Sequence, residues 1–426
     1  MKLSKLQTIA LLLGVFAMVL AACGGQAPAL AAEEQAPPPT DSAEPAEEEA
    51  APDDMTDEFG EIYDADPAVL MKTMGVSDPS AVDPVVAAAM YRAGLPVSDE
   101  MAAKALECWR EKECDTGTGG PITVALADGF GENLWREVTH MEMVLQALTY
   151  PEIGRIIYTT AMFDTQQAIA DVRGLIAQGV DIIVGFPDAG DALLPVVQEA
   201  TDAGILYVTH SYGVLGDGSA YLTSVSEDVC VLGQEFARLL NEEVGTGKVA
   251  YLGGTPGNPL SAYWQSCETP ALGSGLQLVG AADTFWTREG SFEAMSGFLS
   301  AHPDLAGVSY EAAGSFMGGL SAYEAAGLPV NLVLTLRTDE TVLFCEWVDM
   351  GMPEDFKIYF GSGGNYQSRI ALTAAMMQLK GYEVPASIII PTFMQQVNES
   401  HCYRDLPDDA SISSMIPHDV VREMYP

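Results

Sequence analysis

Basic residues are scarce in this chain. Its 426 residues include 19 Lys and Arg against 60 Asp and Glu, which gives a formal net charge of −41 and a pI near 4.1. Recognition of nucleic acid requires clustered Lys and Arg side chains that neutralise phosphates, so this composition argues against nucleic acid as a partner. The acidity fits a solvated exported surface, a salt-rich habitat or an acid-tolerant exterior, and composition does not separate the three.

Motifs of common enzyme classes are also missing. The chain has five His residues, no His-Glu-x-x-His, no Gly-x-Ser-x-Gly and no glycine-rich loop that ends in Lys-Ser or Lys-Thr. The segment 253–258 follows an expected strand and precedes an expected helix, but it lacks the Gly-x-Gly-x-x-Gly spacing of a dinucleotide site. We therefore predict a protein that is not an enzyme and that carries no cofactor.

Cysteine is present without the spacing of a metal site. There is no Cys-x-x-Cys pair and no His at ligand spacing, which argues against zinc, and we predict no bound metal. Apart from Cys23 the number of cysteines is even, which favours disulfides in an oxidising compartment and allows 15 connectivities on paper. Position in the chain favours Cys108 with Cys114 as a local link, Cys230 with Cys267, and Cys345 with Cys402, which would hold the C-terminal tail.

Long hydrophobic runs are absent beyond the N-terminus. Lys2 and Lys5 precede the apolar run 9–20, which is too short for a stable transmembrane anchor and has the form of a signal-peptide core. The four residues that end at Cys23 read Leu-Ala-Ala-Cys and resemble the lipobox of bacterial lipoproteins. The resemblance implies a signal peptide over 1–22 and an extracytoplasmic protein anchored to the bacterial cell membrane only by lipid on Cys23. An ordinary secretory signal with a chance Cys is the alternative.

Two segments separate the leader from the main body. Residues 23–57 are rich in Ala, Pro, Glu, Asp and Gln and have almost no large apolar side chains, so we expect a disordered, self-repelling linker. Residues 58–118 have apolar residues at helical spacing behind capping residues, for example over 83–93 and 98–113. They predict a helical extension packed on the main body, with no visible chemistry.

From residue 121 onward, short apolar runs alternate with amphipathic stretches. Nearly continuous apolar runs are typical of parallel strands covered on both faces, so the sequence predicts an α/β fold with two doubly wound parallel-sheet lobes. In such sheets ligands bind beyond the carboxyl ends of the strands. The expected strands are 122–127, 153–158, 180–185, 205–209, 248–253, 276–281, 306–310 and 330–336, and the expected helices are 133–148, 164–178, 191–203, 227–244, 259–272, 289–301 and 316–326.

Several stretches of this pattern resemble sugar-type, ribose-binding-like periplasmic binding proteins of ABC importers, namely 174–184, 192–205, 247–258 and 301–308. The resemblance implies the type I periplasmic-binding fold, in which two Rossmann-like lobes are joined by a three-crossing hinge. Carried over, the crossings fall near 224–226, 361–364 and 391–392. They delimit an N-terminal lobe of 119–225 plus 363–391 and a C-terminal lobe of 226–362 plus 392–426. The glycines of the second crossing suit a hinge because glycine tolerates large changes in φ and ψ.

The resemblance also implies a function. The protein would act as a monomer that captures a small polar solute, with a carbohydrate as the expected ligand, in a cleft between the lobes and delivers it to an ABC permease. Two alternatives stay open: a sensory or chemoreceptor ligand-binding protein, and the same fold binding a nucleoside, an autoinducer or an amino-acid derivative.

The candidate ligand residues match the family's binding positions or stand near them, and Asp188 is a candidate because it follows the third strand. Aromatic rings stack on the apolar faces of a sugar, and charged or amide groups bond its hydroxyls. Core packing is the alternative role for Trp135, a helix surface for Arg136, and helix capping for Asp188 and Asp339. The candidates are Asn133, Trp135, Arg136, Asp188, Tyr212, Tyr263, Trp286 and Asp339.

The candidate site departs from the ribose pattern in several places. Ser211 and Tyr212 replace the Asp-Arg pair expected after the fourth strand, and the Arg expected near Tyr263 is missing. Ala312 and Ala313 stand where an Asn or Asp is expected, unless Glu311 substitutes. The site keeps aromatic residues and loses polar ones, which argues for a ligand with fewer hydroxyls than a pentose or for one read by other residues.

Overall fold

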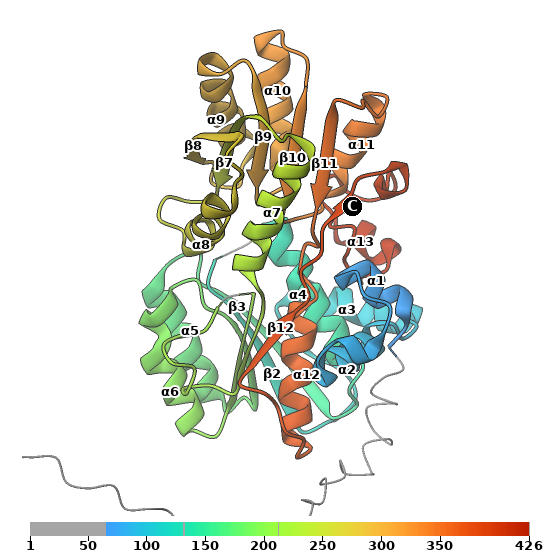
Figure 1. Cartoon of the computed structure of the whole chain (residues 1–426). Helices are drawn as coiled ribbons and strands as arrows, with labels where there is room; N and C mark the ends of the chain where they lie inside the picture. The colour runs from blue at the N-terminus through green and yellow to red at the C-terminus, as the bar shows by residue number, and fades with distance from the viewer. Residues whose placement is uncertain (1–64, 131–132, 212, 426) are drawn as a thin grey trace, which may run out of the picture. The chain divides into compact units, whose positions relative to one another are not determined.

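The computed structural model describes residues 65–130, 133–211 and 213–425 (Figure 1). The predicted signal peptide, Cys23, the linker 23–57, the first residues of the extension and Tyr212 lie outside the described residues. In the part of the chain that is described, none of the helices combines the length and the apolar composition needed to cross a membrane.

The N-terminal extension is helical, as predicted. It contains α1 (Pro67–Met74), η1 (Pro79–Ala81), α2 (Pro84–Ala93) and α3 (Asp99–Glu111), and the three α-helices begin behind side-chain caps from Asp66, Asp83 and Ser98. α3 ends at Glu111 rather than at residue 113, because Lys112 adopts a left-handed φ of 58° and the chain continues as β1 (Glu113–Asp115). The alanine-rich α2 is buried against α4 (Leu134–Leu148) and α12 (Gln367–Leu379), so the extension shares the core of the first lobe.

The first lobe is built on a sheet with strand order β1-β3-β2-β4-β5-β6-β12, parallel except for β1. Alternation along β2 assigns the faces: Val124 and Leu126 pack with α4 and α12, whereas Ala125 and Ala127 pack with α5 and α6. Both faces are therefore covered, which accounts for the apolar runs. The elements are β2 (Ile122–Asp128), β3 (Ile153–Thr160), α5 (Thr165–Gln178), β4 (Ile182–Phe186), η2 (Gly190–Leu193), α6 (Leu194–Asp202), β5 (Leu206–His210), β6 (Thr223–Glu227) and β12 (Ser387–Ile390).

The second lobe repeats the plan with strand order β13-β11-β10-β9-β7-β8, parallel except for β13. Val249 and Tyr251 of β7 pack with α7 and α8, and Ala250 and Leu252 pack with α9, α10 and α11. The elements are α7 (Val229–Glu243), β7 (Gly247–Gly253), α8 (Pro259–Glu268), η3 (Thr269–Ala271), β8 (Leu276–Asp283), α9 (Arg288–Ala301), β9 (Leu305–Tyr310), η4 (Gly314–Phe316), α10 (Met317–Ala326), β10 (Leu332–Leu336), α11 (Thr341–Asp349), β11 (Phe356–Phe360) and β13 (Gln395–Gln396).

The chain passes between the lobes at three hinge crossings: after β6, between β11 and α12, and between β12 and β13. The first passage follows Glu227, because residues 224–226, where it was expected, pair with β12 as part of β6. The three cysteine pairs favoured by chain position are disulfides in the structure: Cys108–Cys114, Cys230–Cys267 and Cys345–Cys402.

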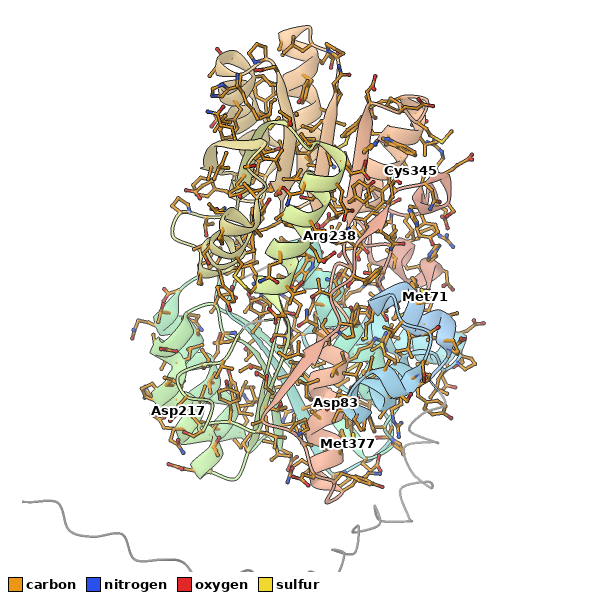
Figure 2. The ribbon with its side chains drawn as sticks, in the orientation of Figure 1. Met71, Asp83, Asp217, Arg238, Cys345 and Met377 are labelled. Carbon is orange, nitrogen blue, oxygen red and sulfur yellow. A yellow bond between two sulfur atoms is a disulfide. The ribbon has the colours of Figure 1, made fainter. Side chains whose placement is uncertain are left out.

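The C-terminal tail departs from the expected division of lobes. It contains η5 (Glu399–His401) and α13 (His418–Met424). The tail begins near Cys402, which forms a disulfide with Cys345 on α11 of the second lobe (Cys345 is labelled in Figure 2). The apolar residues of α13, Val420, Val421 and Met424, are instead buried in the core of the first lobe. The assignment of all of 392–426 to the C-terminal lobe therefore fails for α13, because its apolar face packs on the first lobe.

Candidate functional site

The loops that follow the parallel strands of both sheets meet between the lobes. The ring of Phe130, after β2, contacts the ring of Trp286, after β8, edge to face with centroids 6.4 Å apart. Nearby, Trp135 Nε1 donates a hydrogen bond of 2.8 Å to the carbonyl of Gly363 in the second crossing. Ligands of α/β sheets bind at the carboxyl ends of the strands, so this edge is the candidate binding site.

Arg136 is the centre of a buried ion cluster in the first lobe. Its Nη1 donates to Asp128 Oδ1 at 2.9 Å, and its Nη2 donates to both carboxylate oxygens of Asp188, at 2.9 and 3.1 Å. The guanidinium carbon lies 3.3 Å from the centroid of the Phe186 ring, so the cation is also stacked on an aromatic face. Pairing on two sides and stacking on a third fix Arg136 in one geometry.

This cluster carries one net negative charge, because a single guanidinium serves two carboxylates. Burial raises the pKa of Asp188 to about 6; the Arg136 guanidinium opposes that rise and the charge of Asp128 adds to it. Asp128 has further donors in the Phe130 N–H at 3.0 Å and the Tyr158 hydroxyl at 3.2 Å. Asp188 is therefore the carboxylate of the cluster whose charge is least well compensated.

Glu311 organises the facing side of the second lobe. It follows β9, is 2% exposed, and accepts two indole hydrogen bonds, from Trp264 Nε1 to Oε1 at 2.7 Å and from Trp286 Nε1 to Oε2 at 2.6 Å. Burial raises the pKa of Glu311, whereas hydrogen bonds from Ser261 and the two indoles act to lower it. Trp264 is fully buried and Trp286 is partly exposed, so Glu311 links a core ring to a ring at the candidate site.

Gly254 leaves room for the Trp286 ring. A Cβ at position 254 would overlap the Trp286 indole, and the backbone N–H groups of Thr284 and Phe285 both donate to the Gly254 carbonyl at 3.0 Å. Glycine is needed here because its backbone lets an aromatic ring approach closely.

Two equivalent turns present apolar side chains at this edge. Met162 and Phe163 follow β3 with φ of 52° and 65°, and Phe285 and Trp286 follow β8 with φ of 57° and 53°. Both strands neighbour the first parallel strand of their lobe, and both turns lead directly into a helix cap. Left-handed φ in non-glycine residues costs roughly 1–3 kcal/mol each and persists where surrounding structure enforces it, often at binding sites. The Phe163 ring is 51% exposed and packs on Phe130 with centroids 3.9 Å apart.

Four of the sequence-predicted residues come together at this edge: Trp135, Arg136, Asp188 and Trp286. Asn133 is adjacent, but its Oδ1 accepts the Arg136 N–H at 2.9 Å and caps α4. The surface-helix role considered for Arg136 does not hold, because its side chain is buried.

The remaining predicted residues are placed differently. Tyr263 is 54% exposed on α8. Asp339 is 1% exposed and accepts hydrogen bonds from Ser411 Oγ at 2.5 Å and from the Ser413 N–H at 2.9 Å, both in the C-terminal tail. It is not the cap of α11, because Glu340 holds the cap position.

Other residues of the site were not singled out from the sequence: Asp128, Phe130, Phe163 and Phe186, while Glu311 was considered only as a substitute. Asp128 and Phe186 end their strands, and Phe130 and Phe163 lie in the loops that follow. Their position at or after the end of a strand could have marked these residues as candidates. Their contacts could not be predicted from sequence, because the partners lie on other strands or in the loops that follow them.

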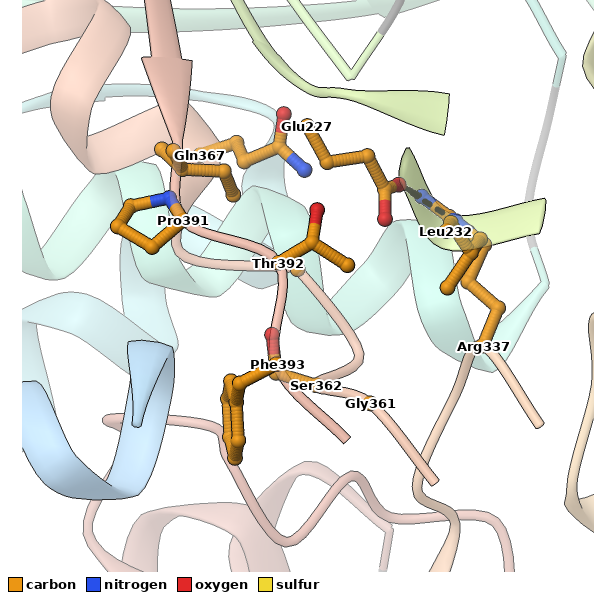
Figure 3. A pocket seen from close by; sticks show the side chains of 11 residues that line it. Glu227, Leu232, Arg337, Gly361, Ser362, Gln367, Pro391, Thr392 and Phe393 are labelled. Atoms are coloured by element: carbon orange, nitrogen blue, oxygen red, sulfur yellow. Dashed lines mark hydrogen bonds and ion pairs between the residues drawn. The ribbon is translucent and has the colours of Figure 1, made fainter. Parts of the chain in front are cut away.

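The hinge crossings meet around a small cavity of about 10 Å³ (Figure 3). Glu227 at the end of β6 accepts a hydrogen bond from Arg337 Nε at 2.5 Å. Gln367 Nε2 and Thr392 Oγ1 also line the cavity, and within the described structure neither buried atom has a hydrogen-bond partner. The volume and the polar lining fit about one water molecule.

The chain is similar to a known protein family. A family model described as a periplasmic binding protein domain matches residues 126–383, which is more than half of the chain. No curated protein sequence is a significant match.

Across the described ranges, no group of three or more His, Cys, Asp or Glu side chains is arranged to hold a metal ion.

Solved structures share the fold at low sequence identity. A solute-binding protein from Actinobacillus succinogenes 130z with bound D-allose has 22% identity and a TM-score of 0.56, over 66% of this chain and 98% of that chain. The binding protein of the arabinose transporter from Shewanella sp. ANA-3, bound to L-arabinofuranose, has 24% identity and a TM-score of 0.57, over 64% and 91%. A solute-binding protein from Bacillus halodurans C-125 with bound myo-inositol has 19% identity and a TM-score of 0.55, over 66% and 96%. With the family match and the two wound lobes taken together, the chain belongs to the periplasmic binding protein family and has its type I fold.

Proposed function

We propose that this chain is an extracytoplasmic solute-binding protein, held at the membrane by lipid on Cys23, that captures a small sugar between its lobes and delivers it to an ABC importer. The observation that carries the proposal is the pairing of an aromatic contact, Phe130 with Trp286, across the lobes beside the buried Arg136–Asp188 ion pair.

The chemistry of this edge suits a polyhydroxylated ring. The rings of Phe130, Phe163 and Trp286 offer apolar faces on which the C–H faces of a sugar stack. Asp188 is an incompletely compensated carboxylate that accepts hydrogen bonds from hydroxyls, and Arg136 holds it in place. The rings bound in the three similar structures carry several hydroxyls, which supports the same class of ligand for this chain.

Binding would work by closure of the lobes about the hinge. The second crossing contains Gly361, Gly363 and Gly364, and Gly364 already adopts a φ of 71°, so this segment tolerates rotation. A ligand that contacts both lobes binds the closed form better and shifts the population toward it. The loaded monomer then presents a joint surface of both lobes to a permease. No bond is made or broken in this cycle.

A thermal-shift screen of the full chain, with Cys23→Ser to omit the lipid, tests the proposal. The panel contains pentoses, hexoses, inositols, nucleosides and amino acids. A ligand at 100 times its dissociation constant stabilises by about 2.7 kcal/mol, which raises the unfolding midpoint by several degrees. A shift with a sugar or an inositol supports the proposal. A shift with nucleosides or amino acids alone contradicts the ligand class, and no shift with any compound contradicts the binding function.

A further inference from the structure

The C-terminal tail is a fourth passage between the lobes. Its first part lies on the second lobe, where Cys402 is bonded to Cys345 and Ile412 is buried in the core. Its last part lies on the first lobe, where Ile416 and the apolar residues of α13 are buried. This passage is anchored by buried side chains on both lobes.

The tail's hydrogen bonds to buried carboxylates change lobe between two consecutive serines. The Ser413 N–H donates to Asp339 Oδ2 at 2.9 Å, in the second lobe. Ser414 Oγ and the Met415 N–H donate to Glu142 Oε1 at 2.8 and 2.7 Å, on α4 of the first lobe. Asp339 and Glu142 are 1% and 0% exposed, so each lobe contributes one buried carboxylate to the passage.

Two cations lie at this passage, and one of them is paired with a carboxylate. Arg369 of α12 pairs with Glu142 Oε2 through its Nε. Lys72 of α1, in the N-terminal extension, donates from Nζ to the Ser414 carbonyl at 2.7 Å. Burial lowers the pKa of Lys72, and the charges of Glu142 and Asp339 oppose that decrease. The ammonium itself contacts the passage at the Ser414 carbonyl.

We propose that Lys72, Asp339 and Glu142, joined by residues 411–415, form an interlobe clamp that limits how far the lobes open. If the lobes rotated apart, the tail could not keep both its hydrogen bond to Asp339 and its hydrogen bonds to Glu142. One of these buried carboxylates would then lose its donors, which is costly. The clamp lies beside the second hinge crossing, since the Gly363 N–H donates to Ser413 Oγ at 3.0 Å. Asp339 is thus a positioning residue rather than a ligand contact.

The consequence for ligand capture rests on the proposed function. The apparent affinity for a ligand is reduced when only a fraction of the protein is in the conformation that binds it. If the clamp limits opening, that fraction is larger and less affinity is lost. Lys72 and residues 411–415 lie outside the family match at 126–383, whereas Asp339 and Glu142 lie inside it, so the clamp joins two carboxylates of the family domain through segments outside the match.

Interlobe distances measured without ligand test the clamp. Spin labels at Asp202→Cys at the end of α6 and Glu324→Cys on α10 report on the two lobes, and both sites are exposed. In the full chain with Cys23→Ser, pulsed electron paramagnetic resonance should give one narrow distribution of distances between the two labels. Lys72→Met should broaden it toward longer distances, Lys72→Arg should restore the narrow form, and Lys104→Met, which removes a lysine of α3 in the same extension, should leave it unchanged.

The clamp is overturned if folded Lys72→Met keeps the narrow distribution, or if Lys104→Met broadens it equally. Should Lys72→Met not fold, Ser411→Ala removes one hydrogen bond to Asp339 without removing a charge, and the same broadening is required of it. Because no ligand is present, the result is independent of the sugar screen. A broadened distribution with no sugar binding would leave the clamp standing and refute the proposed function alone.

Discussion

Replacing Asp188 by Asn should change how stability depends on pH, because burial raises the pKa of this carboxyl from 3.8 to about 6. A carboxyl whose pKa is higher in the folded than in the unfolded state favours folding only while it is protonated. Its contribution is therefore complete below pH 3.8 and is lost as the pH rises through about 6. Since a tenfold change in proton affinity corresponds to about 1.4 kcal/mol, the loss amounts to about 3 kcal/mol.

Urea unfolding of wild type and Asp188→Asn across this pH range measures the effect. The free energy of unfolding of wild type minus that of the variant should fall by about 3 kcal/mol as the pH rises, because Asn does not titrate. Asp217→Asn is the control on an exposed loop of the same lobe: hydrogen bonds from Ser219 lower the pKa of Asp217, so its stabilising contribution is instead lost as the pH falls. A difference for Asp188→Asn that does not change with pH would refute the argument that burial outweighs the Arg136 pairing.

Three further outcomes follow from the packing. Trp264→Ala removes a fully buried ring and should destabilise by about 3–5 kcal/mol in denaturant unfolding, whereas Trp286→Ala should cost much less; equal losses would place Trp286 in the core. Replacing Cys345 and Cys402 together by Ala should cost about 2–5 kcal/mol and make the tail the first site of limited proteolysis, and unchanged cleavage would contradict its tethering role. A crystal structure should show one ordered water in the hinge cavity, hydrogen-bonded to Gln367 Nε2 and Thr392 Oγ1. A direct hydrogen bond between these two groups, with no water present, would contradict this prediction.

Most of the fold from residue 122 to 336 could be predicted because its strands and helices have their own local patterns, but β6 (Thr223–Glu227) was expected only as a hinge crossing. The predicted strand 122–127 is observed as Ile122–Asp128 and the predicted helix 164–178 as Thr165–Gln178. Several elements outside this range lacked such patterns. α12 is buried over Gln367–Met377, so it has no amphipathic period, and the short β1 and β13 exist only through antiparallel pairing with β3 and β11.

The site was predictable where its residues matched family positions or followed a predicted strand. Trp135, Arg136 and Trp286 could be placed by the first signal and Asp188 by the second. Asp339 was assigned to the ligand because it matches a family carboxylate. Its bonds to Ser411 and Ser413 could not be predicted, because these partners lie 72 and 74 residues further along the chain. The left-handed turn at Phe163 and the two indole bonds to Glu311 depend on tertiary packing, which no local pattern reports.

Isothermal titration calorimetry with the sugar that gives the largest thermal shift measures how much the Trp286 ring contributes to ligand binding. Wild type should bind it with one site per chain. Trp286→Ala should weaken binding by about 2 kcal/mol, or about 30-fold, because a stacking ring at the centre of a site contributes about this much. Phe292→Ala, which removes an exposed ring on α9 of the same lobe, should bind as wild type does. Unchanged affinity in folded Trp286→Ala would contradict a binding site between the lobes at this edge.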